Sequence, residues 1–288
     1  VRKKGIARSL ATEIISLGEA IARSLGKSKT LSESVTASEA IARQKAVRRA
    51  LRAVLGIELD GTNDYIDFGT ETGFWSGTLA TFSISFWMIS KAVTDGFDRR
   101  VIQHGVASAQ GFGAYIDGAV ANRMNWRLRD SAGVTKTAFH DGVIANQLQH
   151  VVLVYNNTLG AGNIRIYIDK VLGTNITLTE TITFSAPLRV ADSGSNHFKG
   201  TIRDLRFWKT KALSVTEIGQ VYDNNPAAPT PDYWAPMEEG QGNPIDIISG
   251  TKTGTLTNGP TWNNTSDLVV VSDSVAKVKG GTIARALT

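Results

Sequence analysis

Residues 82–88 read Phe-Ser-Ile-Ser-Phe-Trp-Met, an alternation of apolar and polar side chains that predicts a β-strand with one buried face. Further strand-like runs cover residues 151–155, 164–168 and 200–208. Glycine, asparagine and aspartate residues that favour turns separate these runs, and little of this part of the chain has helical periodicity. Strands at this spacing favour an antiparallel β-sandwich over alternating strand–helix units.

The predicted sandwich occupies residues 57–265, which hold most of the aromatic side chains. Within it, a proline-containing connector over residues 224–235 precedes closing strands over residues 236–265. Residues 1–56 form a separate basic extension, and residues 266–288 form a short C-terminal tail. The chain starts without Met and carries no signal peptide, so we expect a processed or excised form of a longer product.

Five ordered segments of the predicted sandwich carry recognisable motifs. In chain order they are Leu59-Asp60-Gly61-Thr62-Asn63-Asp64-Tyr65-Ile66-Asp67-Phe68, Thr81-Phe82-Ser83-Ile84-Ser85-Phe86-Trp87, Gln149-His150-Val151-Val152-Leu153-Val154-Tyr155, Ile164-Arg165-Ile166-Tyr167-Ile168-Asp169-Lys170 and Phe198-Lys199-Gly200-Thr201-Ile202-Arg203-Asp204-Leu205-Arg206-Phe207-Trp208. Together they resemble the concanavalin A-like lectin/glucanase superfamily, and within it the laminin-G-like domains of the third type.

The resemblance covers about 200 of the 288 residues and implies a jelly-roll sandwich. The superfamily includes lectins, adhesins, hydrolases and structural modules, so the fold alone does not decide the function. Its members usually carry Asp-Glu in the closing strand, where this chain has Arg203-Asp204. If the first of those acids binds a metal in relatives, this chain has lost that ligand.

The net charge of +5 is distributed unevenly along the chain. Residues 1–56 contain 12 Lys/Arg against 4 Asp/Glu, a net charge of +8, which leaves −3 for residues 57–288. The extension also repeats itself, because Ala-Ile-Ala-Arg occurs at residues 20–23 and again at residues 40–43. Residues 283–285, Ile-Ala-Arg, echo this repeat in the C-terminal tail, so the two ends of the chain are similar.

Two conformations compete for the repeat in the extension. As a helix, it places Ile14, Leu17 and Ile21 in one apolar stripe, and its Ala, Leu, Arg and Glu residues are good helix formers. As a strand, its even period of 20 residues keeps equivalent side chains on one face. Helix is favoured, strand stays open, and either form leaves an apolar stripe that has to pack against something.

These features predict a non-enzymatic structural protein that assembles with copies of itself through its two ends, located extracellularly or on a cell or virion surface. Filaments or rings are the expected products of such head-to-tail contacts. The expected assembly residues are Ile14, Leu17, Ile21, Ile41, Arg43, Arg48, Val275 and Ile283. The alternative is a carbohydrate-binding adhesin, in which the extension is a stalk and the jelly roll binds glycans.

Several other classes of protein are disfavoured. The absence of cysteine excludes disulfides, Cys-based metal sites and thiol catalysis. Glycoside hydrolysis needs a carboxylate pair across the scissile bond, but no Glu-x-Asp-x-x-Glu run occurs, and the adjacent Glu238 and Glu239 would face opposite sides of a strand. No apolar run is long enough to span a membrane. Nucleic-acid binding by the extension is disfavoured because no aromatic residue accompanies its arginines.

Calcium is the metal that the sequence suggests. Asp60, Asn63 and Asp64 supply hard oxygen ligands within one turn, and Asp204 on the closing strand could face them in this fold. In the competing interpretation, Asp60 and Asn63 accept hydrogen bonds from their own backbone and only shape the turn. No other cofactor is expected.

Trp75, Tyr115, Trp126 and Arg127 are the candidate glycan-binding residues, because exposed aromatic rings and planar polar groups suit sugar rings and hydroxyls. Phe112 and Trp234 are weaker candidates of the same kind. Large aromatic side chains also dominate the cores of sandwiches, so each of these rings competes with an ordinary packing role. His150, in a strand motif, is expected to be a structural hydrogen-bonding residue.

Overall fold

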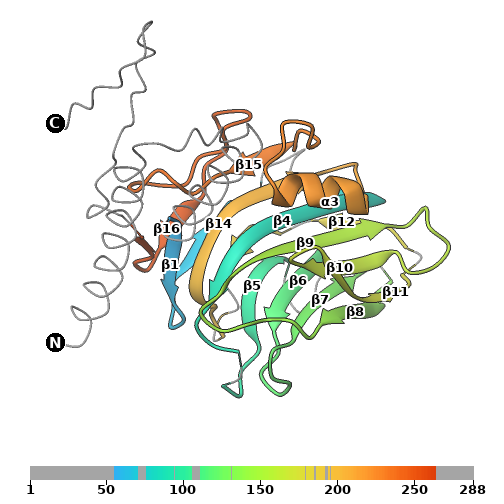
Figure 1. Cartoon of the computed structure of the whole chain (residues 1–288), viewed down its shortest axis with the longest axis horizontal. Coiled ribbons are helices and arrows are strands. Elements are labelled where there is room, and N and C mark those ends of the chain that lie inside the picture. Colours follow the sequence, from blue (N-terminus) through green and yellow to red (C-terminus); the bar gives the residue numbers. More distant parts are fainter. Residues whose placement is uncertain are drawn as a thin grey trace, which may run out of the picture. The chain divides into compact units, whose positions relative to one another are not determined.

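The computed structural model describes residues 55–263, except 71–75, 94, 106–110, 131, 179, 185, 192–193 and 195 (Figure 1). In these residues the chain forms two large antiparallel sheets, which confirms the predicted mainly β jelly-roll sandwich. The strands begin at Ile57 and end at Trp262. The extension and the tail lie outside the described residues, so their conformation and the proposed boundaries stay predictions.

Sheet A has the strand order β11-β10-β9-β4-β14-β1-β17, and β15 pairs with the part of β14 beyond β1. Its strands are β1 (Ile57–Asp60), β4 (Thr81–Ser90), β9 (Leu148–Asn156), β10 (Ile164–Ile168), β11 (Val171–Ile176), β14 (Lys199–Trp208), β15 (Tyr233–Ala235) and β17 (Thr261–Trp262). The motif of residues 82–88 therefore lies in the centre of sheet A, between β9 and β14.

Sheet B has the strand order β16-β2-β13-β5-β6-β7-β8. Its strands are β2 (Tyr65–Asp67), β5 (Arg99–His104), β6 (Gly111–Ile116), β7 (Met124–Arg129), β8 (Thr135–His140), β13 (Leu188–Val190) and β16 (Thr255–Thr257). The short strands β3 (Gly77–Leu79) and β12 (Ile182–Phe184) pair separately as a ribbon. Sheet B is thus a continuous surface built from four long neighbouring strands and three short ones.

The main core fills the space between the two sheets. Phe82 on β4 shows how it is packed: its ring lies 5.3 Å from Phe184, 5.8 Å from Phe112 and 6.0 Å from Trp126, measured between ring centroids. Each contact joins different strands, and the Phe82–Trp126 contact joins sheet A to sheet B. Aromatic packing of this kind holds the sheets together without a disulfide.

A second, smaller core covers part of the outer face of sheet A. Helix α3 (Val215–Tyr222) begins with a capping box between Ser214 and Glu217, and its Ile218 and Val221 pack against Val152 and Val154 of β9. This packing explains why β9 is buried on both faces. Figure 1 shows α3 against sheet A. In the described part of the chain, no helix is long and apolar enough to span a membrane.

Candidate functional site

Strand alternation decides which side chains of sheet B face outward. Met124, Trp126 and Leu128 of β7 are fully buried in the main core. Because successive residues of a strand point to opposite faces, Arg127 and Arg129 lie on the outer face of the sheet. They share this face with side chains of β5, β6 and β8.

A β-bulge in β5 brings Arg100 to the same face. The pairing of β5 with β6 shifts between Arg100 and Ile102, and Val101 and Ile102 are both buried. Without the irregularity, Arg100 would point inward like Ile102, because residues two apart on a regular strand share a face. The bulge therefore re-aims the Arg100 side chain, a known use of such irregularities.

Two arginines flank one aromatic ring on this face. The Arg100 Cζ atom lies 4.6 Å from the centroid of the Tyr115 ring, and the Arg127 Cζ atom lies 5.5 Å from the same centroid. Both distances are in the range of cation–π contacts. Tyr115 thus positions two guanidinium groups beside one another in a half-buried setting.

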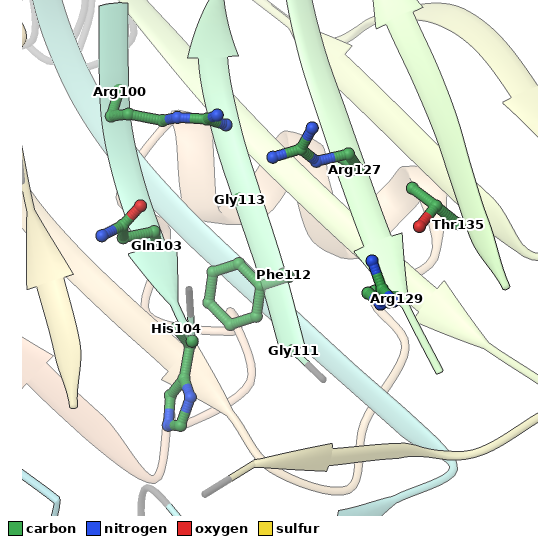
Figure 2. Close-up of a pocket in the computed structure, with 10 residues that line it drawn as sticks. Arg100, Gln103, His104, Gly111, Phe112, Gly113, Arg127, Arg129 and Thr135 are labelled. Carbon is green, nitrogen blue, oxygen red and sulfur yellow. The ribbon is translucent and has the colours of Figure 1, made fainter. Parts of the chain in front are cut away.

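A hollow of about 130 Å³ lies beside this group. Its lining includes Arg100, Gln103, Gly113, Arg127, Arg129 and Thr135. Figure 2 shows the Arg100 and Arg127 side chains pointing toward one another from either side of Gly113. The hollow therefore presents several hydrogen-bond donors around the strand backbone at Gly113.

Burial and like charge act together on the two arginines. Burial lowers the pKa of Arg100, and the positive charge of Arg127 lowers it further. Burial raises the pKa of Tyr115, so the phenol between them stays neutral at physiological pH. Arginine keeps its proton in proteins, so the site holds two positive charges and a neutral ring.

The structure brings only part of the predicted glycan set together. Tyr115 and Arg127 lie side by side, whereas Trp126 was wrongly expected at the surface: its indole faces the main core, edge-on to Phe82. Phe112 is also buried. Trp75 lies outside the described residues.

Trp234, a weaker glycan candidate, is bound to side chains of β14. Its ring lies under the Arg206 guanidinium, with 4.2 Å between Arg206 Cζ and the ring centroid, and its Nε1 donates to Asp204. Arg100, Gln103 and Arg129 were not among the predicted site residues. The sequence holds one signal of the direction of Arg100. The apolar residues 101 and 102 are adjacent, which breaks the alternation of β5 and indicates an irregular strand.

The expected calcium residues are separated by the structure. Asp60, Asn63 and Asp64 share one turn, but Asp204 does not face it, because Lys199 is the residue of β14 that pairs with Asp60. Five residues of extended strand place Asp204 roughly 16 Å further along. Its carboxylate is bonded to Arg206 and Trp234 instead.

Within the turn, the carboxylates accept backbone hydrogen bonds. The Thr62 N–H donates to Asp60 Oδ1 at 2.7 Å, and the Asp60 N–H donates to Asp64 Oδ2 at 3.0 Å. Among the described residues, no group of three or more His, Asp or Glu side chains is placed to hold a metal ion. Calcium binding by the three turn residues stays a prediction, and the backbone bonds favour the competing interpretation, in which these carboxylates shape the turn.

Glu238 and Glu239 each have a structural partner. Glu238 is ion-paired with Arg203, and Glu239 accepts a hydrogen bond from the Ile245 N–H at 3.1 Å. His150 packs against Trp87 and Tyr222, with ring centroids 4.9 Å and 5.6 Å away, and its Nδ1 has no hydrogen-bond partner in the described part of the chain. The expected hydrogen-bonding role of its side chain is therefore replaced by packing.

All eight predicted assembly residues lie outside the described residues. They are Ile14, Leu17, Ile21, Ile41, Arg43, Arg48, Val275 and Ile283. Nothing in the described sandwich tests them, and the assembly hypothesis stays a prediction.

A family model described as the concanavalin A-like lectin/glucanases superfamily, of the laminin-G-like kind, matches residues 60–219, more than half of the chain. The chain belongs to this superfamily. No curated protein sequence matches the chain. The fold is one that carbohydrate-binding and structural domains use, and such domains are typically non-enzymatic and extracellular.

Three solved structures are similar to this chain at low sequence identity. A heptameric pentraxin from Limulus polyphemus is 14% identical, with a TM-score of 0.48 over 70% of this chain and 94% of the pentraxin chain. The binding domain of botulinum neurotoxin serotype G is 19% identical, with a TM-score of 0.42 over 53% of this chain and 38% of that one. Domains LG4-5 of the mouse laminin alpha1 chain are 13% identical, with a TM-score of 0.43 over 56% of this chain and 43% of that one.

Proposed function

We propose that this member of the superfamily is a non-catalytic saccharide-binding module and that its ligand lies on the outer face of sheet B. The observation that carries the proposal is the hollow at Gly113, flanked by Tyr115 and by donors from β5, β7 and β8. Convergent polar groups of this kind fix the orientation of a ligand in a small-molecule site. In the described part of the chain, α3 covers the other sheet and leaves this face to solvent.

We place the ligand on the outer face of sheet B and not on that of sheet A because the two faces expose different side chains. On sheet A, Val152, Val154 and Tyr167 are buried beneath α3 and have no access to a ligand. On sheet B, Gln103, Tyr115 and Arg127 are half-buried and keep polar atoms at the surface. Guanidinium and amide groups supply several donors each, which suits the closely spaced hydroxyls of a sugar ring.

A glycan array with the full chain tests the proposal. We expect binding that Gly113→Leu abolishes, because the new side chain fills the hollow; a Cβ there meets nothing closer than 3.6 Å, so the strand tolerates it. Gly160→Leu is the matched control, in the loop between β9 and β10, where a Cβ meets nothing within 4 Å. No binding to any glycan, or equal loss in both variants, would contradict the proposal.

A second candidate function is assembly with copies of the same chain, extracellularly or on a cell or virion surface. It is supported by the basic repeat of residues 1–56 and its echo in the tail. Ile21 and Ile41 lie at equivalent positions of the two repeats, and the apolar stripe that contains Ile21 needs a partner to be buried. Light scattering of the full chain should show large particles that the double variant Ile21→Asp/Ile41→Asp disperses, and a full chain that is monomeric at high concentration would exclude this function.

A further inference from the structure

The hollow on sheet B is positively charged although the rest of the sandwich is not. Residues 57–288 carry a net charge of −3, yet Arg100, Arg127 and Arg129 line one hollow and none of its lining residues is Asp or Glu. Residues 106–110, which follow the lining residue Gly105, read Val-Ala-Ser-Ala-Gln and contain no acid either. The cluster of arginine side chains is therefore a feature of this hollow and does not reflect the charge of the sandwich as a whole.

Neighbouring arginines have carboxylate partners. The guanidinium of Arg123 bonds Asp141 at 2.6 Å, and that of Arg189 bonds Asp67 at 2.8 Å. Within the described residues, no such ion pair involves Arg100 or Arg127. Among the charged side chains that act on Arg100, Arg127 has the largest effect, and Asp98 has a smaller, opposite one. Two like charges held together favour a bound anion, which would remove the repulsion between them.

Gly113 keeps the space between the two arginines open. Its neighbour in the hollow, Gly111, has a backbone reason to be glycine, with φ +136° and a Cβ position 1.9 Å from the His104 carbonyl oxygen. Gly113 has no such constraint, and a Cβ there would make ordinary contacts at 3.6 Å with Arg100 and at 4.0 Å with Gln103. A strand glycine that the backbone does not require is typical of a place where a ligand approaches closely.

From these contacts we infer that Arg100 and Arg127 together hold an oxyanion of an acidic saccharide, a carboxylate or a sulfate ester, directly above Gly113. The inference rests on the proposed function and narrows its ligand class. The planar guanidinium fork matches the two oxygens of either group with parallel N–H···O bonds. Tyr115 holds both forks in place, so little side-chain freedom is lost when the anion binds.

Calorimetry with three oligosaccharides of equal length tests the inference: a sulfated one, a uronate and a neutral glucan. We expect the full chain to bind at least one of the two acidic ligands, more weakly as salt is added, and not to bind the neutral one. The sulfated and uronate arms distinguish the two sources of the oxyanion.

Variants then locate the anion. Arg100→Gln and Arg127→Gln should each weaken binding about tenfold or more, because each removes a charge-assisted hydrogen-bond pair. Arg127→Lys keeps the charge but loses the fork, and should fall between the wild type and Arg127→Gln. Lys211→Gln, which removes the same charge beside α3, should leave the affinity within about twofold. Urea unfolding of each variant shows whether it remains folded.

The contradicting outcomes separate the two proposals. If the neutral glucan binds, and Gly113→Leu removes this binding while both Arg→Gln variants keep it, the saccharide site stands and the oxyanion inference falls. If no saccharide binds, the proposed function falls and the inference with it. If a single-stranded oligonucleotide binds more tightly than any saccharide and loses affinity in the same arginine variants, the ligand is a nucleic acid and both proposals are wrong.

Discussion

Trp234 donates a hydrogen bond of 2.6 Å from its indole Nε1 to Asp204 Oδ1. The same carboxylate binds the Arg206 guanidinium through both oxygens, at 2.9 and 3.0 Å. Asp204 has φ +53° and lies where the pairing of β14 with β4 shifts register. The irregularity of β14 thus turns the Asp204 carboxylate toward Trp234, which lies 30 positions away in the chain and donates a hydrogen bond to it.

Asp204→Asn should destabilise the protein by about 3–5 kcal/mol, because it leaves the buried Arg206 without its counter-charge. Asparagine tolerates the left-handed backbone well, so the loss would not come from φ. Urea unfolding measures it. Asp141→Asn is the matched control, since Asp141 pairs with Arg123 at the surface, where solvent screens the pair, and its loss should be much smaller. Equal small losses in both variants would show that the buried pair contributes little.

Trp126→Ala should cost about 3–5 kcal/mol, because it empties a fully buried site in the main core. Trp126→Phe should cost less, since the indole Nε1 has no hydrogen-bond partner in the described part of the chain. Saccharide affinity distinguishes the buried face of β7 from the outer face of sheet B. Trp126→Phe should leave saccharide affinity within about twofold, whereas Tyr115→Ala on the outer face should weaken it; the reverse order would place the ligand elsewhere.

His150 should make the protein less stable in mild acid. Burial lowers the pKa of His150 to about 3, although the charge of Asp204 partly opposes the shift. An unfolded histidine has a pKa of about 6.5, so below this pH the unfolded state binds the extra proton and stability falls by up to about 1.4 kcal/mol per pH unit. The loss ends below about pH 3, where the folded state also binds the proton.

The variant His150→Phe isolates this contribution. A phenyl ring can pack against Trp87 and Tyr222, and it has no group that binds a proton. Free energies of unfolding at about pH 7.5 and about pH 5 should therefore differ less in His150→Phe than in the wild type. Identical pH dependence in the two proteins would mean that the ring is accessible to protons in the folded state.

Asp60→Ala should cost about 1 kcal/mol through the lost bond to the Thr62 N–H, which is also the main cause that lowers the pKa of Asp60. We expect the same cost in EDTA and in calcium, because the carboxylates of Asp60 and Asp64 already accept backbone hydrogen bonds. Thermal unfolding under both conditions measures it. A rise in Tm with calcium that Asp60→Ala abolishes would instead support calcium binding at this turn.

Two residues of the candidate site, Tyr115 and Arg127, could be predicted from the sequence. The chemistry of Tyr115 and Arg127 identifies them as candidate ligand-binding residues. The same reasoning also identifies Trp126, although Trp126 and Arg127 are consecutive on one strand and cannot share a face. Which of Trp126 and Arg127 faces the solvent depends on which face of sheet B is buried, and this face is buried by the opposite sheet. Arg100 could not be predicted, because its direction comes from a bulge in the pairing of β5 with β6. The same holds for the contact of Asp204 with Trp234, because Trp234 comes from β15.

From the sequence by itself, the alternation of residues 82–88 determined β-strands, the resemblance of the five motifs to a known superfamily implied a jelly-roll sandwich, and a charge count located the excess of basic residues at 1–56. These are local properties, because a period of two residues and a charge count need no knowledge of distant parts. Tertiary structure alone decided which face of each strand is outward, since alternation defines two faces without distinguishing them. It also decided that Arg100 and Arg127 meet at Tyr115, because strand pairing joins residues that are far apart in the chain.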